Sequence, residues 1–143
     1  MKKLVAERLN YQSVPLKDIE AIVSICLNNH PELEFSVAEV SGLIAQNVTF
    51  VVRDDCGQIV ACVFVSKVVM VKKKIALMHC PLASSGIRII PTDVYAALVE
   101  QICQYASDSH FYGVVCLCKG ELPEESRGTS GFNREGVFML KKV

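Results

Sequence analysis

The hydrophobic pattern of this chain changes its period at Val48. Before this residue, apolar side chains recur every three or four positions, which is the spacing of one face of a helix. From 48 to 82, apolar and β-branched segments are separated by short turns, as in adjacent antiparallel strands. A strand, a loop, a helix and another strand follow up to 118. This order predicts an α+β fold, in which helices pack on a mixed and mainly antiparallel sheet.

Local signals predict where the elements lie. The first helix stops before Pro31, because the residue before a proline resists helical angles. The second begins at Ser36, which fits a capping box with Glu39, and the third opens at Thr92 or Asp93. We expect six to seven strands and about four helices, with strands over 3–9, 48–53, 58–71, 75–82, 111–118 and 132–142 and at most a short helix in 120–131.

Two tight turns are expected to join the mid-chain strands. Asp54–Gly57 makes the first, with glycine at a left-handed position. Lys72–Lys74 makes the second, and we interpret its lysines as a solvated hairpin tip rather than a binding patch.

The composition favours a single domain spanning 1–143. The chain is 51% hydrophobic and 21% charged, which is enough apolar material for one core, and no linker divides it. Fifteen Lys and Arg balance fifteen Asp and Glu, which argues against binding nucleic acid or an anionic membrane. The longest apolar run, Ile59–Val65, is far shorter than the about 20 residues of a membrane helix. Glu7 and Arg8 interrupt any signal peptide, so we expect a cytoplasmic protein.

The cysteines are expected to be reduced and free of metal. Their number, seven, is odd, and most of them lie in apolar segments, where a free thiol behaves as a small hydrophobe. No Cys-x-x-Cys pair of the kind that zinc sites use occurs in the sequence. His79 and Cys80 are adjacent, but neighbouring strand residues point to opposite faces, so they make a poor catalytic dyad.

Several segments resemble the GCN5-related N-acetyltransferase (GNAT) superfamily over essentially the whole chain. They are a first strand and helix at Glu7–Leu9 and Pro15–Ile22, a hairpin at Val51–Ala61, a strand at Phe111–Leu117, and Gly131-Phe132 before a last strand at Val137–Lys141. Within the superfamily, Gly57–Ala61 and the strand that starts at Phe111 look most similar to the glucosamine-phosphate N-acetyltransferases.

The resemblance implies transfer of an acetyl group from acetyl-CoA to a primary amine. In the family, the fourth and fifth strands separate and the pantetheine arm lies between them; here these would be 75–82 and 111–118. The pyrophosphate binds a loop before the third helix, because the free N–H groups and the dipole of a helix N-terminus attract anions. Carried over by position, the implied cofactor contacts are Met78, Cys80 and Leu82 on the strand and Ser84, Ser85, Gly86 and Arg88 in the loop.

The sequence departs from the family pattern at this loop. It has one glycine, Gly86, where the family has two small residues leading directly into the helix. If the alignment is made without a gap, Pro91 and Asp93 fall on the loop instead. A proline has no N–H to offer, and a carboxylate at the helix end would compete with phosphate. Either a longer loop uses Gly86 and Arg88, or cofactor binding is weak or lost.

Candidate catalytic residues are His79 and Ser126. A base must take a proton from the amine, and His79 has a suitable ordinary pKa; the alternative is a partly buried histidine bonded to a neighbour. The family often has a tyrosine that protonates the leaving thiolate, but here Ser126 or Arg127 would support it. A glutamate cluster in 121–125 would either hold a cationic substrate or form a solvated loop.

The sequence thus predicts an N-acetyltransferase that acts on a small-molecule amine or amino sugar by direct attack. The alternative is a GNAT-like binding or regulatory module that has lost catalysis. The expected partners are a small-molecule amine and acetyl-CoA, with no nucleic acid and no membrane. A homodimer is one arrangement that the resemblance implies, since apolar edge strands could pair across a two-fold axis. The transferase prediction depends on separation of the strands 75–82 and 111–118.

Overall fold

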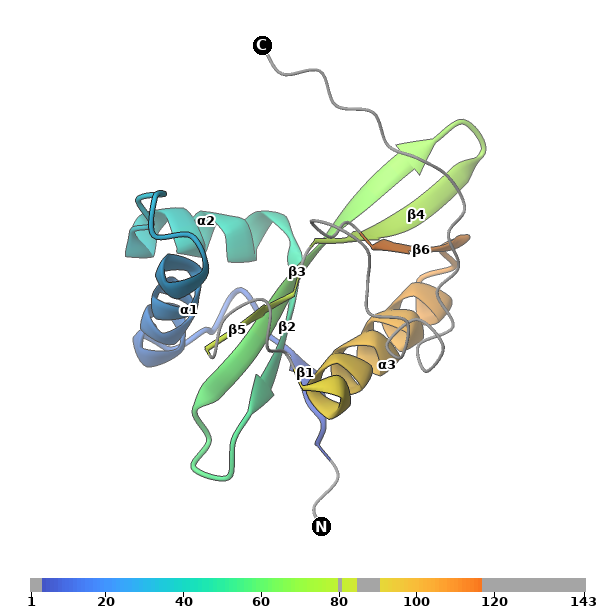
Figure 1. Ribbon diagram of the computed structural model, residues 1–143. Helices are drawn as coiled ribbons and strands as arrows, with labels where there is room; N and C mark the ends of the chain where they lie inside the picture. The colour runs from blue at the N-terminus through green and yellow to red at the C-terminus, as the bar shows by residue number, and fades with distance from the viewer. Residues whose placement is uncertain (1–3, 80, 85–90, 117–143) are drawn as a thin grey trace.

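The computed structural model describes residues 4–79, 81–84 and 91–116 (Figure 1). The predicted segments 120–131 and 132–142 lie outside these residues. In chain order, the elements are β1 (Ala6–Arg8), α1 (Leu16–Asn29), α2 (Val37–Gln46), β2 (Val48–Arg53), β3 (Ile59–Met70), β4 (Lys73–Met78), β5 (Leu82–Ala83), α3 (Thr92–Asp108) and β6 (Gly113–Cys116).

The six strands of the described residues form one sheet with the order β1-β2-β3-β4-β6. Every neighbouring pair on this path is antiparallel except β4 and β6, which run parallel. The short β5 pairs with β3 on the edge opposite β2, so that β4 and β5 lie end to end along β3. The predicted α+β class with a mixed, mainly antiparallel sheet is confirmed.

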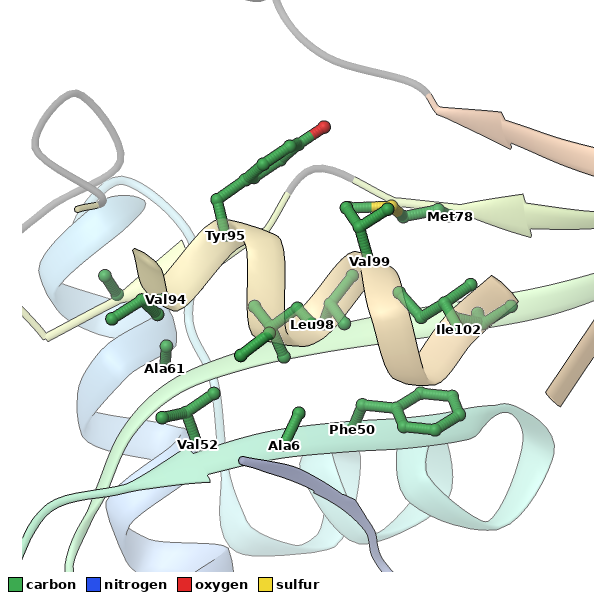
Figure 2. Close-up of a cluster of buried hydrophobic side chains, with 14 of the residues drawn as sticks. Ala6, Phe50, Val52, Ala61, Met78, Val94, Tyr95, Leu98, Val99 and Ile102 are labelled. Atoms are coloured by element: carbon green, nitrogen blue, oxygen red, sulfur yellow. The ribbon is translucent and has the colours of Figure 1, made fainter. Parts of the chain in front are cut away.

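Helices cover both faces of the sheet. Figure 1 shows α1 and α2 on one side and α3 on the other. The strand period of two divides the apolar side chains between the two faces: Phe50 and Val52 pack under α3, whereas Val51 packs under α1 and α2. In Figure 2, Leu98 and Ile102 of α3 lie over the strand residues that line this core. The sheet is therefore buried from both sides along β2 and along β3 as far as Val65.

The two mid-chain turns differ in how well they were predicted. The Asp54–Gly57 turn is as expected: Gly57 has a φ of 81°, and the Asp54 carboxylate accepts the N–H groups of Cys56 and Gln58, each at 2.9 Å. The second turn is shorter than the predicted Lys72–Lys74, because β4 already begins at Lys73. Of these three lysines, Lys72 alone takes a left-handed φ, of 64°. The Lys73 ammonium instead lies 4.0 Å from the Tyr112 ring centroid, a cation–π contact across to the start of β6.

The predicted strand over 75–82 is interrupted. Val65 pairs with Met78 and Cys62 pairs with Leu82, so residues 63–64 of β3 lie opposite 79–81, which contain one residue more. An extra residue cannot continue a regular ladder, and Pro81 has no N–H to donate to it. The prediction of one continuous strand is therefore wrong, and β4 and β5 are its two halves.

The start of α3 also differs from the prediction. Its N-cap is Pro91 rather than Thr92 or Asp93, and no side chain caps it. The extended backbone of Pro91 suits this position, and its carbonyl accepts the Tyr95 N–H at 3.0 Å, which closes the first turn. The Asp93 carboxylate lies inside that turn and accepts the Val94 N–H at 2.9 Å.

A charged cluster ties α1 to the sheet. The guanidinium of Arg53, at the end of β2, donates to both carboxylate oxygens of Asp18 at 3.0 and 2.8 Å, and its Nε donates to Glu7 of β1. Asp18 is buried, with 5% of its surface exposed. The hydrogen bonds from Arg53 hold the pKa of Asp18 below its ordinary value. This cluster closes the end of the sheet where β2 turns into β3.

Candidate functional site

His79 lies at the interruption, directly after the last residue of β4. Its backbone N–H donates to the Phe64 carbonyl of β3 at 3.0 Å, which holds the residue against the sheet. The ring is half-buried, and its Nε2 is 2.7 Å from the hydroxyl of Ser66 on β3. His79 is therefore a partly buried histidine bonded to a neighbour, which was one of its two expected interpretations. This bond uses one ring nitrogen, so the geometry is compatible with the other interpretation, a base.

A second polar contact continues from Ser66 to the end of α2. The Ser66 hydroxyl is 2.7 Å from Oδ1 of Asn47, which is the C-cap residue of α2. The Asn47 amide group in turn donates to the Leu43 carbonyl in the last turn of that helix, at 3.0 Å. The three side chains thus form a chain of hydrogen bonds that joins α2, β3 and the end of β4. We call Asn47, Ser66 and His79 the polar relay.

Burial lowers the pKa of His79 below its ordinary value. Water is partly excluded from the ring, which disfavours the charged imidazolium. The imidazole is consequently neutral at pH 7, with one nitrogen carrying a proton and the other a lone pair. A neutral imidazole can accept a proton from an ammonium group, whereas an imidazolium cannot.

The implied strand contacts Met78 and Leu82 lie on either side of the interruption. The Met78 side chain is fully buried in the core under α3, beside Val99 (Figure 2). The Leu82 side chain packs in the opposite core, under α1 and α2. Neither buried side chain has a free surface for a ligand, so any contact from these residues would come from the main chain.

The strands expected to separate are paired over a portion of their length. Four parallel pairs run from Ile75–Gly113 to Met78–Cys116. Beyond the last of these pairs, β5 is bonded to β3 and to no other strand of the described residues. The residues that follow Cys116 are outside the described ranges, so separation beyond Met78 stays a prediction.

The implied loop contacts are described only at Ser84. Its N–H donates to the Val60 carbonyl at 2.9 Å and is not available to a phosphate, but its side chain is exposed. The amide of Asn29, at the end of α1, donates to the Ala83 carbonyl at 2.9 Å and fixes the preceding residue. Outside the described residues lie Cys80, Ser85, Gly86, Arg88, the glutamates of 121–125, Ser126 and Arg127.

The N-terminus of α3 is partly occupied by the chain itself. The Asp93 carboxylate accepts one of the first N–H groups of the helix, as described above. A phosphate approaching this end would meet both a filled donor and a negative charge. The competition between Asp93 and phosphate stays a prediction.

Sequence reasoning missed two residues of the polar relay. Neither Asn47, which lies at the end of its helix, nor Ser66 was singled out as a candidate site residue. One signal was available for Ser66: with the adjacent Lys67, it interrupts the apolar sequence of β3. Its partners are 19 and 13 positions away along the chain, so only the strand pairing brings them together.

Two of the described cysteines, Cys26 and Cys62, are buried. Burial raises the pKa of the Cys26 thiol to about 11, and burial with Cys26 nearby raises the pKa of Cys62 further. Both thiols are protonated at neutral pH and are poor nucleophiles and ligands. Among residues 4–79, 81–84 and 91–116, no group of His, Cys, Asp and Glu side chains is placed to hold a metal ion. None of the helices in these ranges is long and apolar enough to span a membrane.

Neither a protein-family profile nor a curated protein matches the sequence. Solved structures do match along nearly the whole chain. An aminoglycoside acetyltransferase from an uncultured soil metagenomic sample, in complex with sisomicin, has a TM-score of 0.73 and 15% identity over 99% of this chain and 97% of that one. A ribosomal-protein-alanine N-acetyltransferase from Brucella melitensis biovar Abortus 2308 has a TM-score of 0.71 and 11% identity over 96% and 99% of the two chains.

An acetyltransferase from Trypanosoma brucei is similar at a TM-score of 0.67 and 15% identity, over 98% of this chain and 99% of that one. Identities this low show the fold alone. The chain therefore has the GNAT-like α+β fold that the sequence predicted.

Proposed function

We propose that the protein is an N-acetyltransferase that moves an acetyl group from acetyl-CoA to a primary amine of a small molecule or amino sugar. The observation that carries this proposal is the interruption at residues 79–81, which puts the neutral imidazole of His79 where β4 ends its pairing with β6. The similar solved structures support it, because acetyltransferases with different named substrates share this fold.

Acetyl-CoA would supply a reactive thioester, and the chain would position the amine and manage its proton. His79 takes a proton from the ammonium group, directly or through a water molecule. The neutral amine then attacks the carbonyl carbon, an N–C bond forms, and the C–S bond breaks without a covalent enzyme intermediate. The electron pair of that bond leaves on sulfur as a thiolate, which Ser126 is expected to support. As the amide forms, the nitrogen gives up its second proton to the thiolate, and the His79 imidazolium releases the first proton to solvent. The products are an amide, coenzyme A and one proton.

The proposed cofactor contacts are the implied ones. The main chain of Met78, Cys80 and Leu82 would face the pantetheine arm, and Ser84, Ser85, Gly86 and Arg88 would face the pyrophosphate. The first set draws support from β5, which pairs with a single strand, β3, among the described residues, although the Ala83 carbonyl is already bonded to the Asn29 amide. Likeness to the glucosamine-phosphate enzymes rests on Gly57–Ala61 and on the strand that starts at Phe111, and it stays a prediction, as do the cytoplasmic location and the homodimer.

One observation favours the alternative, a GNAT-like binding or regulatory module. The Asp93 carboxylate lies in the first turn of α3, where the family is expected to bind pyrophosphate. If the charge prevents binding, the fold remains but the transfer is lost.

Titration calorimetry with acetyl-CoA separates these two functions. The transferase requires binding by the wild-type chain, and Asp93→Asn should tighten it about two- to fivefold, because the variant removes a negative charge from the helix end. A binding module that has lost the cofactor gives no heat with either protein.

Turnover is measured as release of coenzyme A with a panel of primary amines, including aminoglycosides and amino sugar phosphates. His79→Gln should lower kcat by about 10²- to 10⁴-fold, the usual contribution of a general base, and leave acetyl-CoA binding unchanged. Equal kcat values for this variant and the wild type would exclude His79 as the base. Acetyl-CoA binding without turnover on any amine would favour the regulatory module.

A further inference from the structure

We infer that Asn47 and Ser66 are positioning residues, which fix His79 as the tautomer with its proton on Nε2 and leave the lone pair on Nδ1. This inference deepens the proposed function and rests on it for its catalytic meaning, because it names the atom of His79 that would accept the proton. The tautomer itself can be measured without any substrate.

The direction of the polar relay is set at its first member. Asn47 contacts the Leu43 carbonyl at 3.0 Å, and a carbonyl can only accept, so the amide nitrogen must face it. The amide oxygen, Oδ1, therefore faces Ser66 at 2.7 Å. Exchanging the two ends of the amide would set its oxygen against the Leu43 carbonyl oxygen, and two acceptors without a shared proton repel each other.

The orientation of the Asn47 amide determines where the Ser66 hydroxyl proton and the His79 ring proton lie. Since Oδ1 can only accept, the Ser66 hydroxyl donates its single proton to Asn47. The same oxygen lies 2.7 Å from Nε2 of His79 and has no second proton to give. Nε2 must then be the donor in this contact, so it carries the ring proton. In the neutral imidazole, the lone pair is left on Nδ1.

The three residues are held by different elements. Asn47 caps α2, Ser66 lies within β3, and His79 is fixed by its backbone bond to Phe64. A ring whose tautomer and orientation are fixed in advance needs no rearrangement before it accepts a proton. The relay therefore prepares His79 without contacting the reacting atoms.

The wild-type protein, labelled with ¹⁵N, is studied by long-range ¹H–¹⁵N correlation of its imidazole rings at pH 7.5. We expect Nε2 of His79 at the shift of a protonated ring nitrogen and Nδ1 at that of an unprotonated one. His30 is half exposed, and its Nδ1 lies 3.6 Å from Oε1 of Glu32. Its ring signals in the same spectrum are the reference with which those of His79 are compared. A proton on Nδ1 of His79 would overturn the inference, whatever any variant shows.

Two substitutions of Ser66, whose new side chains have the same shape, test the role of its hydroxyl group. Ser66→Thr keeps the hydroxyl and should keep the Nε2–H form, whereas Ser66→Val loses it and should give a mixture of tautomers. In the transfer assay, kcat should fall about tenfold in the valine variant and recover in the threonine variant, with the KM for acetyl-CoA unchanged. Identical tautomers in both variants would show that Ser66 does not fix the ring.

Failure of the proposed function gives a different result. A chain that transfers no acetyl group can still show the Nε2–H form and its loss in Ser66→Val, and the relay then stands without catalysis. Conversely, an active enzyme with a mixed tautomer in the wild type refutes the relay and leaves the transferase intact.

Discussion

The half-buried imidazole of His79 makes the stability of the fold depend on pH. Its pKa is lowered in the folded state, while the unfolded chain has the ordinary value of about 6.5. Above this pH, neither state holds the proton. As the pH falls below it, the unfolded chain binds a proton first, so the free energy of unfolding decreases until the folded-state pKa is reached.

We therefore expect His79→Gln to lose less stability than the wild type between pH 7.5 and pH 5.5. Urea denaturation at both pH values measures the two free energies of unfolding. Other groups titrate equally in the two proteins, so their difference isolates His79. Parallel changes in the two proteins would mean that burial does not suppress protonation of this ring.

Asp18 is the second residue whose charge state matters for stability. Replacement by Asn keeps the shape but removes the charge that accepts two hydrogen bonds from Arg53, and we expect a loss of about 1.5–3 kcal/mol at pH 7. Asp55→Asn, in the exposed turn, is the control and should change stability by less than about 0.5 kcal/mol. Since the pKa of Asp18 is lowered, the wild-type advantage should persist above the unfolded pKa and disappear as the pH falls through the folded one. Equal stabilities of Asp18→Asn and the control in urea would refute this role.

For single residues, the sequence indicated which side chains could carry chemistry, but it did not indicate which side chains they would bond to. His79 could be chosen because a histidine in the fourth strand has chemistry of its own. Ser66 and Asn47 have ordinary roles in a strand and at a helix end. Only the registers of β2 against β3 and of β3 against β4 bring them to that ring.

Among the elements, α2 offers the clearest test of a local signal. Ser36 accepts the Glu39 N–H at 3.1 Å, and the Glu39 side chain accepts the Ser36 N–H at 3.2 Å, which is the predicted capping box. Ser36→Ala should lower the free energy of unfolding by about 1 kcal/mol. In the helix interior, Ser41→Ala should be neutral or stabilising, because alanine is the better helix former. A smaller loss for Ser36→Ala than for Ser41→Ala in thermal or urea unfolding would contradict the cap.

The remaining element boundaries show which of them neighbouring residues in the sequence can predict and which they cannot. β2 was predicted at its observed bounds because β-branched residues and a glycine turn delimit it. The interruption at 79–81 was not, because it depends on how many residues of two strands lie opposite each other. Likewise, the start of α3 at Pro91 reflects backbone geometry rather than side-chain capping.

For the molecule as a whole, the position of β3 predicts a gradient of local stability. β3 is bonded on both edges, to β2 on one and to β4 and β5 on the other, and Cys62–Val65 are buried. Hydrogen exchange should be slowest for these amides and fast for β1, which has three residues and, among the described strands, a single neighbour. Faster exchange in β3 than in β1 would be inconsistent with this sheet order.

The overall class followed from the change of period at Val48, which separated the two helices before it from the run of mid-chain strands after it. The acceptor could not be predicted in the same way. Specificity depends on which side chains of distant loops face each other, and no hydrophobic pattern encodes that arrangement.

The polar relay has a consequence for biosynthesis, because its members and the Leu43 carbonyl all belong to one continuous stretch, 43–79. Contacts of short sequence separation form first, and chains emerge from the ribosome with their N-terminal end leading. This corner of the molecule can thus be completed during translation, before α3 and β6 have emerged from the ribosome. His79 would then be aligned with Ser66 and Asn47 before these later elements pack against the sheet.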